Sequence, residues 1–144
     1  MSRYVIDASV ALKWFVEEEY SRTAVGLLQP SCGRLAPDLL LPELGNILWK
    51  KQRRKEIGRE EGFRLLNDFK QIPVTLFPSR ELLGRAFEIA VTFERTLYDS
   101  MYVALAIAEN CPLVTADRKL YNALSAGAMA KHLCWIEHAR TERE

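Results

Sequence analysis

Apolar residues in this chain fall into two kinds of segment, short continuous runs and longer stretches with helical spacing. In the longer stretches apolar residues recur every three or four positions, which predicts helices. The short runs are bounded by turn residues and predict strands. These strands are expected around residues 4–7, 34–36, 74–77, 113–115 and 134–136.

Strands that alternate with helices are typical of a parallel sheet built from right-handed crossovers. We therefore predict an α/β fold, a three-layer α/β/α sandwich with a mostly parallel sheet of four to five strands. The chain has 144 residues, which fits a single domain over residues 1–144 with a sizeable core.

Several side chains suggest where the helices begin. Ser9 is placed to cap a helix after the first strand, and Ser79 to cap a later one. Pro42 suits an early helical position. Asp99 is expected to open the most hydrophobic helix, whose residues 101–108 leave almost no polar face. That helix should be packed on more than one side.

Composition adds limits on function. Hydrophobic residues make up 49% of the chain and charged residues 27%, as in an ordinary globular protein. The formal net charge of +1 excludes a strongly basic coat for nucleic acid. Residues 50–55 nevertheless contain five cations, which read either as a solvated helix end or as a patch that contacts phosphates.

The cysteines and the apolar runs indicate a cytoplasmic protein without a membrane segment. Cys32, Cys111 and Cys134 are odd in number and far apart, which argues against a disulfide framework and a zinc site. The first apolar run is too short for a signal peptide. No run approaches the roughly 20 apolar residues that a membrane span needs.

Missing motifs exclude several kinds of chemistry. The chain has neither a phosphate-binding P-loop nor a Gly-x-Gly-x-x-Gly dinucleotide motif. It also lacks the Gly-x-Ser-x-Gly elbow that would indicate acyl transfer. Only two histidines occur, His132 and His138, and both lie near the C-terminus, beyond the acidic positions.

Four acidic residues stand at the ends of apolar segments: Asp7, Glu43, Asp99 and Asp117. Taken singly, each could be a helix cap or a turn residue. Taken together, they could meet, because ligands of an open parallel sheet bind outside the carboxyl ends of its strands. Clustered carboxylates need a compensating cation, and their oxygens suit Mg²⁺, with Mn²⁺ as an alternative. One or two such ions could activate water toward a phosphodiester.

With these acids in place, the chain resembles the PIN domain family and, within it, the compact VapC-type toxins. The resemblance spans nearly the whole chain and rests on four motifs in order, at residues 5–9, 36–43, 97–106 and 113–117. It implies a parallel sheet between helices and a magnesium-dependent ribonuclease that acts on single-stranded RNA.

The resemblance also implies roles for individual residues. Asp7 and Asp99 would be the principal metal ligands, and Glu43 and Asp117 would complete the site directly or through water. Ser9 and Thr115 fall where the family often has a hydroxyl that holds water or phosphate, although both could be simple caps. Arg118 and Lys119 follow Asp117 where some relatives carry a further acid, so the number of metal ions stays open.

RNA, an antitoxin and a second copy of the chain are the partners that the resemblance implies. The RNA backbone would contact Arg118, Lys119, Lys50 and Lys51. A cognate antitoxin would lay a helix in an apolar groove, and homodimers are common in the family. Three aromatic residues face such a groove or belong to the core: Trp14, Phe15 and Trp49.

Two other functions are alternatives to a ribonuclease. A PIN-like module that has lost turnover would serve in RNA binding or scaffolding, but degeneration normally removes an acid and all four are present. A phosphatase that forms an aspartyl phosphate has a second aspartate two residues after its nucleophile. Ser9 occupies that position here, which argues against a phosphatase.

Overall fold

A parallel sheet of five strands forms the centre of the computed structural model, which describes residues 2–139. The predicted strands are confirmed, and the neighbouring strands of this sheet all pair in parallel. Their order in the sheet is β3-β2-β1-β4-β5, with β1 in the middle. The strands are β1 (Ser2–Ile6), β2 (Cys32–Pro37), β3 (Thr75–Phe77), β4 (Leu113–Thr115) and β5 (Leu133–Trp135).

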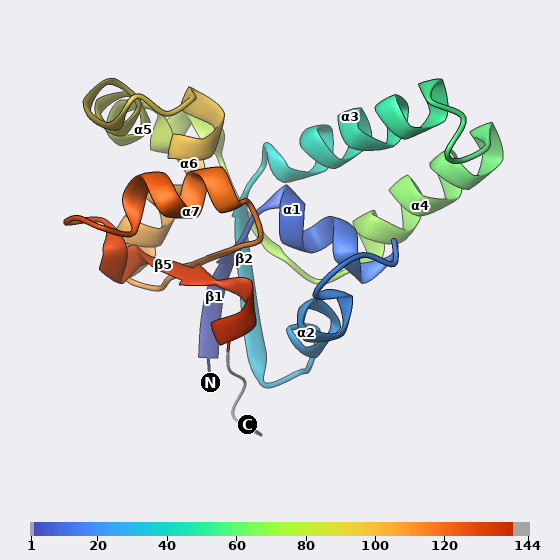
Figure 1. The fold of residues 1–144 in the computed structure, drawn as a ribbon, viewed down its shortest axis with the longest axis horizontal. Coiled ribbons are helices and arrows are strands. Elements are labelled where there is room, and N and C mark those ends of the chain that lie inside the picture. Colours follow the sequence, from blue (N-terminus) through green and yellow to red (C-terminus); the bar gives the residue numbers. More distant parts are fainter. Residues whose placement is uncertain (1, 140–144) are drawn as a thin grey trace.

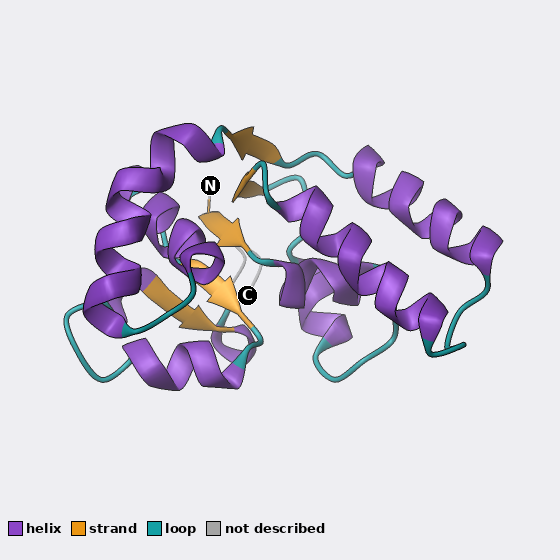
Figure 2. Ribbon diagram, turned by 90° about the horizontal axis from the view of Figure 1, so that it is seen from above, coloured by secondary structure: helices purple, strands orange, loops and turns teal. Residues whose placement is uncertain are grey.

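Helices cover both sides of the sheet, so the three-layer α/β/α fold is confirmed (Figures 1 and 2). Helices α1 to α4 lie on one side and α5 to α7 on the other. The α-helices are α1 (Ala8–Ala11), α2 (Ser21–Gly26), α3 (Leu40–Arg53), α4 (Arg59–Gln71), α5 (Ser79–Phe93), α6 (Leu97–Glu109) and α7 (Arg118–Leu124). Short 3₁₀ turns cover η1 (Leu12–Trp14), η2 (Ala130–His132) and η3 (Ile136–His138).

The strand order reverses direction between β1 and β4. From β1 the chain adds β2 and then β3 on one side, and then returns to add β4 and β5 on the other side. Such a reversal opens a crevice at the carboxyl ends of the two middle strands, because their helices leave on opposite faces. Asp7 follows β1 and Asp117 follows β4, so the topology brings both acids to this crevice.

Helix α6 is the most enclosed helix of the fold. Its residues 100–106 are all buried, and it contacts β1, β2, β4 and α5. The prediction that this helix is packed on more than one side is therefore confirmed. Asp99 lies in the first turn of this helix, directly before its buried segment.

Three predicted helix starts are wrong by one or two residues. Asp7, not Ser9, caps α1, because its carboxylate accepts the backbone N–H of Val10 at 3.1 Å. Helix α6 begins at Leu97 behind the cap Thr96, so Asp99 does not open it. Ser79 is the first residue of α5, and its hydroxyl donates to Asp38 instead of capping the helix.

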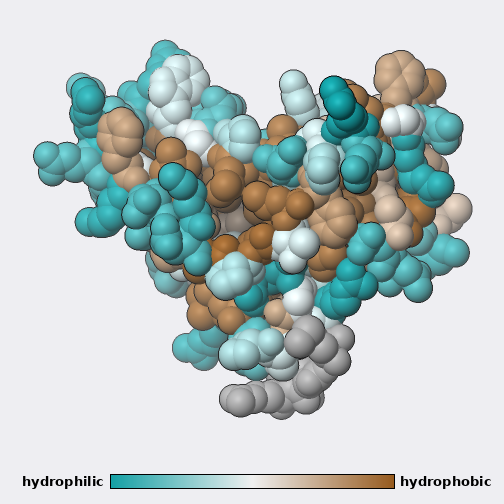
Figure 3. Space-filling model, turned by 180° about the vertical axis from the view of Figure 1, so that it is seen from behind, coloured by the Kyte–Doolittle hydropathy of each residue, from teal (hydrophilic) through white to brown (hydrophobic). Residues whose placement is uncertain are grey.

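The three aromatic residues with open assignments divide between core and surface. Trp14 is buried and donates its indole N–H to the carbonyl of Ala24 at 2.9 Å, so it belongs to the core. Phe15 and Trp49 are exposed. Apolar surface runs across the middle of the face in Figure 3.

Between residues 2 and 139, no helix is both long and apolar enough to cross a bilayer.

Candidate active site

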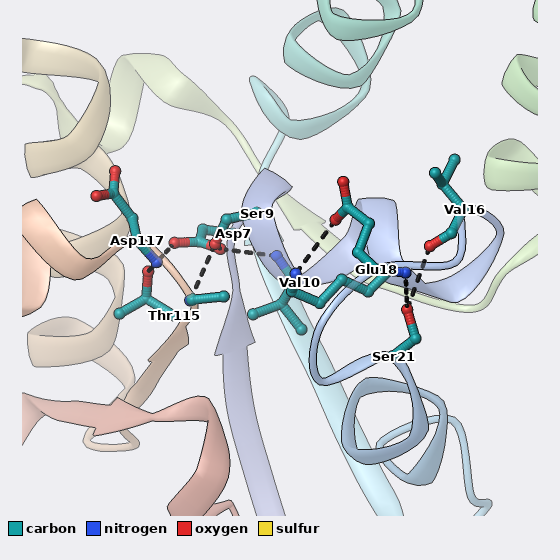
Figure 4. A network of polar contacts seen from close by, with 10 residues as sticks. Asp7, Ser9, Val10, Val16, Glu18, Ser21, Thr115 and Asp117 are labelled. Atoms are coloured by element: carbon teal, nitrogen blue, oxygen red, sulfur yellow. Dashed lines mark hydrogen bonds and ion pairs between the residues drawn. The ribbon is translucent and has the colours of Figure 1, made fainter. Parts of the chain in front are cut away.

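Asp7 and Asp117 lie where the two middle strands, β1 and β4, end side by side. Strands β1 and β4 pair through Val5–Leu113 and Ile6–Val114. β1 ends at Ile6, and β4 ends one residue after its last pair with β1, at Thr115. Figure 4 shows the Asp7 side chain beside Thr115 and Asp117, which come from the end of β4. The sheet register therefore fixes where the backbones of Asp7 and Asp117 lie.

Both carboxylate oxygens of Asp7 accept hydrogen bonds from the protein. Oδ1 accepts the Ser9 hydroxyl at 2.6 Å and the Val10 N–H at 3.1 Å. Oδ2 accepts the Thr115 hydroxyl at 2.5 Å. Only 7% of the residue is exposed. Asp7 is thus held in one orientation with little contact to water.

Ser9 and Thr115 connect the ends of β1 and β4. Each hydroxyl donates to Asp7 and also accepts a backbone N–H from the chain after β4. Ser9 accepts from Ala116 at 3.0 Å, and Thr115 accepts from Asp117 at 3.0 Å. Neither residue caps a helix, so their observed role is to orient Asp7 and the turn that carries Asp117.

Glu43 reaches the crevice from the first turn of α3 and is held by Tyr102. The Tyr102 hydroxyl donates to Glu43 Oε1 at 2.5 Å. Tyr102 was not predicted from the sequence, where it reads as one more member of an apolar helix. Its spacing from Asp99 is the signal that could have found it, because residues three apart share a helix face.

Burial and mutual repulsion raise the pKa values of three of the four acids. Burial is the largest cause for Asp7, whose pKa rises to about 6 despite its hydrogen bonds, and the charge of Asp117 raises it further. Burial also raises the pKa of Glu43 and of Asp99, with the charge of Asp99 acting on Glu43 and that of Asp117 acting on Asp99. Electrostatics therefore link the four acids as one cluster.

The same cluster acts on Tyr102. Burial and the charges of Glu43, Asp7 and Asp99 raise the pKa of its phenol far above the ordinary value. Tyr102 accordingly stays protonated at neutral pH and remains a hydrogen-bond donor to Glu43.

The chemistry of the cluster fits a hard divalent cation. All four candidate ligands are carboxylates. Burial, together with repulsion between neighbouring acids, raises the pKa values of Asp7, Glu43 and Asp99, and a bound cation would favour their charged forms. Among residues 2–139, no three His, Cys, Asp or Glu side chains lie close enough to hold one ion directly. Mg²⁺ often binds through one or two carboxylates and keeps several waters, so the set suits Mg²⁺ with water-mediated contacts.

The four basic candidates lie in different surroundings. Lys50 is exposed and lines the same cavity as Glu43. Lys51, the next residue on α3, is half-buried. The guanidinium of Arg118 lies 3.9 Å from the centre of the Trp135 ring, while Lys119 is exposed. Of these four cations, Lys50 is the one that lines a cavity together with an acid of the cluster. A fifth cation that was not predicted from the sequence, Arg95, acts on the cluster through its charge, which lowers the pKa of Asp99.

Comparison with known proteins decides the family. The family model of the PIN domain matches residues 4–124 of this chain. The chain belongs to the PIN domain family. The PIN domain resemblance that the sequence motifs indicated is thereby confirmed.

Curated PIN-domain relatives match most of the chain. The VapC ribonuclease Mb0985 of Mycobacterium bovis is 35% identical over 117 residues, which cover 81% of this chain and 87% of the relative. Ribonuclease VapC3 of Pyrobaculum aerophilum is 34% identical over 122 residues, which cover 82% and 92%. Both relatives are therefore similar to this PIN-domain chain over nearly their full lengths.

Solved structures share the PIN-domain fold. The crystal structure of PAE2754 from Pyrobaculum aerophilum aligns with a TM-score of 0.64 at 25% identity, over 85% of this chain and 79% of that chain. VapC20 of Mycobacterium tuberculosis aligns with a TM-score of 0.63 at 18% identity, over 85% and 95%. The second similarity concerns the fold alone.

Proposed function

We propose that this PIN-domain protein is a Mg²⁺-dependent endoribonuclease that cleaves single-stranded RNA, and that it is the toxin of a type II toxin–antitoxin pair. One observation carries the proposal. Four carboxylates from four separate segments form one electrostatic cluster at the point where the strand order reverses. The names of the VapC ribonucleases that match most of this chain support the same activity.

In this proposal Asp7 and Asp99 are the principal metal ligands, and Glu43 and Asp117 act directly or through water. Mg²⁺ is the proposed ion and Mn²⁺ the alternative. When bound, the ion lowers the pKa of a bound water and offsets negative charge on the phosphate. Because Arg118 and Lys119 follow Asp117 where some relatives carry a further acid, the proposal leaves the number of ions, one or two, open.

The chain's own residues orient the reaction. Ser9 and Thr115 fix both oxygens of Asp7, which keeps this carboxylate from rotating when substrate arrives. Tyr102 fixes one oxygen of Glu43 and leaves the other available. Asp7 is 7% exposed, so an RNA strand must enter the crevice to reach it, which a single strand does more easily than a duplex.

The proposed partners are a cognate antitoxin and a second copy of the chain, and the proposed location is the cytoplasm. These proposals rest on the VapC relatives and on the exposed aromatic surface. A pocket between α3 and α4 is lined by Gly45, Leu48, Trp49 and Phe63 among others. An apolar groove of this kind suits an amphipathic helix of a partner protein.

Cleavage of a mixed RNA panel tests the proposed activity. We expect the protein, free of any antitoxin, to cut single-stranded RNA in Mg²⁺ or Mn²⁺ and to be inactive in EDTA. Duplex RNA of the same sequences should resist, because it cannot enter the crevice. Gel analysis of labelled RNAs measures both. If a folded, antitoxin-free sample cuts no RNA of a panel broad enough to hold every trinucleotide, the chain is a binding module.

Tyr102→Phe tests whether the phenol positions Glu43. Removing the hydrogen bond should raise the pKa of Glu43 further, because that bond lowers it. Groups that orient metal ligands typically contribute tenfold to a hundredfold, so we expect about a tenfold rise in the Mg²⁺ concentration needed for half-maximal cleavage. An Mg²⁺ titration of the cleavage rate measures the shift. Tyr20→Phe is the matched control, since it removes a phenol–glutamate hydrogen bond outside the cluster, from Tyr20 to Glu137 at 2.8 Å. An unchanged Mg²⁺ requirement in Tyr102→Phe would refute the positioning role.

A further inference from the structure

A cavity of about 420 Å³ opens beside the carboxylate cluster, between the first turns of α3 and α6. Glu43 belongs both to the cluster and to the wall of this cavity. The other lining side chains include Asn46 and Lys50 from α3 and Tyr98 from α6. The volume lies within the range of small-molecule sites, which is about 300–1,000 Å³. Whatever fills the cavity therefore lies next to the reacting centre.

Tyr98 gives this cavity an aromatic wall. It directly precedes Asp99 and is 58% exposed, so its ring is not part of the core. An exposed ring beside a carboxylate of the cluster is available to stack against a flat ligand. Nucleobases stack on such rings regardless of sequence, because every base has a π-face.

One face of α3 leads from the carboxylates to the basic segment. Glu43, Asn46 and Lys50 are spaced three and four residues apart and so share that face. Lys50 lies about 10 Å along the helix from Glu43, at 1.5 Å per residue. Arg54, exposed just past the end of α3, continues the row. A chain of phosphates that leaves the crevice along α3 would meet these cations.

We propose that this cavity binds the base of a nucleotide next to the cleaved phosphodiester, with Tyr98 stacking on the base. Asn46 then offers an amide to the edge of the base, and Lys50 contacts the adjoining phosphate. This inference rests on the proposed ribonuclease function and adds a base-binding subsite to it.

The lining favours RNA over a protein segment as the occupant. Glu43, Asn46 and Lys50 give this cavity acceptors, donors and a cation within one helix face. The pocket between α3 and α4 differs, because its lining side chains are apolar apart from Gln52 and the indole N–H of Trp49. A partner helix suits that apolar pocket, whereas a nucleotide needs the mixed polar and aromatic lining beside Glu43.

Three variants test the subsite through kcat/KM on the best-cleaved oligonucleotide of the RNA panel. Tyr98→Ala should lower kcat/KM by about tenfold or more, and Tyr98→Phe should keep most of it, because the ring still stacks. Phe87→Ala is the matched control: Phe87 is 62% exposed on α5 and does not line the cavity. Phe87→Ala should cleave like the wild type. Wild-type cleavage by Tyr98→Ala would overturn the inference and favour a protein partner as the occupant.

Abasic substitutions identify the nucleotide that Tyr98 contacts. We expect one abasic position next to the cleaved bond to slow the wild type about as much as Tyr98→Ala does. Tyr98→Ala should be insensitive to that same substitution. Equal penalties in both proteins at every position would overturn the stacking contact even if Tyr98→Ala is slow.

A binding measurement separates failure of this subsite from failure of the proposed function. The probe is a single-stranded RNA with 2-aminopurine at each position in turn, mixed with Asp7→Asn to prevent cleavage. Stacking on Tyr98 should quench the 2-aminopurine fluorescence at one position. A double variant that carries both Asp7→Asn and Tyr98→Ala should show no quenching there. Absence of wild-type cleavage would refute the ribonuclease alone, whereas absence of quenching would refute the base site alone.

Discussion

Asp7→Asn is expected to lower RNA cleavage by at least about a hundredfold without unfolding the protein. Groups that only orient a metal ligand contribute tenfold to a hundredfold, and the proposed ligand itself should contribute more. Asp7 is also the most enclosed of the four carboxylates, with both oxygens held by hydrogen bonds. Single-turnover kinetics at saturating Mg²⁺ would measure the loss.

The surroundings of Asp7 can accommodate the amide. The retained oxygen still accepts the Ser9 hydroxyl and the Val10 N–H, and the new NH₂ group faces Thr115. The Thr115 hydroxyl can rotate to accept this N–H, because an oxygen of this kind has two lone pairs. A loss of activity in Asp7→Asn therefore reports on chemistry and not on folding.

Asp68→Asn is the matched control for Asp7→Asn. Asp68 is half-buried on α4 and belongs to no part of the carboxylate cluster. Its substitution should leave cleavage within about twofold, which is the size of effect expected for a site without a special role. Full activity in Asp7→Asn would refute the ligand role of Asp7, since no neighbouring acid can replace a carboxylate so tightly held.

The metal-free wild type should become less stable than Asp7→Asn as the pH rises from about 4 to 7. The pKa of Asp7 rises from its ordinary value of 3.8 to about 6 in the folded protein, chiefly because of burial. The folded state therefore binds this proton more tightly than the unfolded state. The resulting stability is fully present below the ordinary pKa and is lost as the pH passes through 6.

The unfolding free energy of the wild type, relative to that of Asp7→Asn, should fall by about 3 kcal/mol over this pH range, at about 1.4 kcal/mol per pKa unit. Urea unfolding in EDTA at a series of pH values would measure it, as the unfolding free energy of the wild type minus that of Asp7→Asn. Taking the difference removes the contributions of Glu43 and Asp99, whose pKa values are raised in both proteins. A difference that does not change with pH would show that Asp7 titrates normally.

Mg²⁺ should reduce this difference at pH 7. An ion that binds the folded wild type stabilises it in proportion to the logarithm of the ion concentration over its dissociation constant. Asp7→Asn lacks a proposed ligand and should gain less. The protein would thus give up stability at Asp7 when the ion is absent and recover it when the ion binds.

The sheet and two of the acids were predictable because local patterns determine them. Short apolar runs ended at Asp7 and near Asp117, and alternation with helices required a parallel sheet. From those two facts the meeting of both acids at one edge follows. The apolar sequence after Asp99 likewise indicated a buried helix, which α6 is.

The contacts between distant segments were not predictable from local patterns. Serine is a common helix cap, yet the Ser9 hydroxyl donates to Asp7 and accepts the backbone N–H of Ala116. Tyr102 pairs with Glu43 across 59 positions of sequence. The spacing of residues within one helix cannot predict this partner, because the packing of α3 and α6 around the sheet determines which side chains meet.

The hydrogen bond from Thr115 to Asp7 joins residues 108 positions apart, and it has a consequence for synthesis of the protein. Long-range contacts of this kind form late, since the intervening chain must first be ordered. During translation, Asp7 can form this hydrogen bond only after β4 has been synthesised and has paired with β1. A truncated or nascent chain that ends before β4 therefore contains Asp7, Glu43 and Asp99 but lacks both Asp117 and the Thr115 hydroxyl that orients Asp7. If the proposed nuclease needs all four acids in place, unfinished copies of the chain should therefore be inactive.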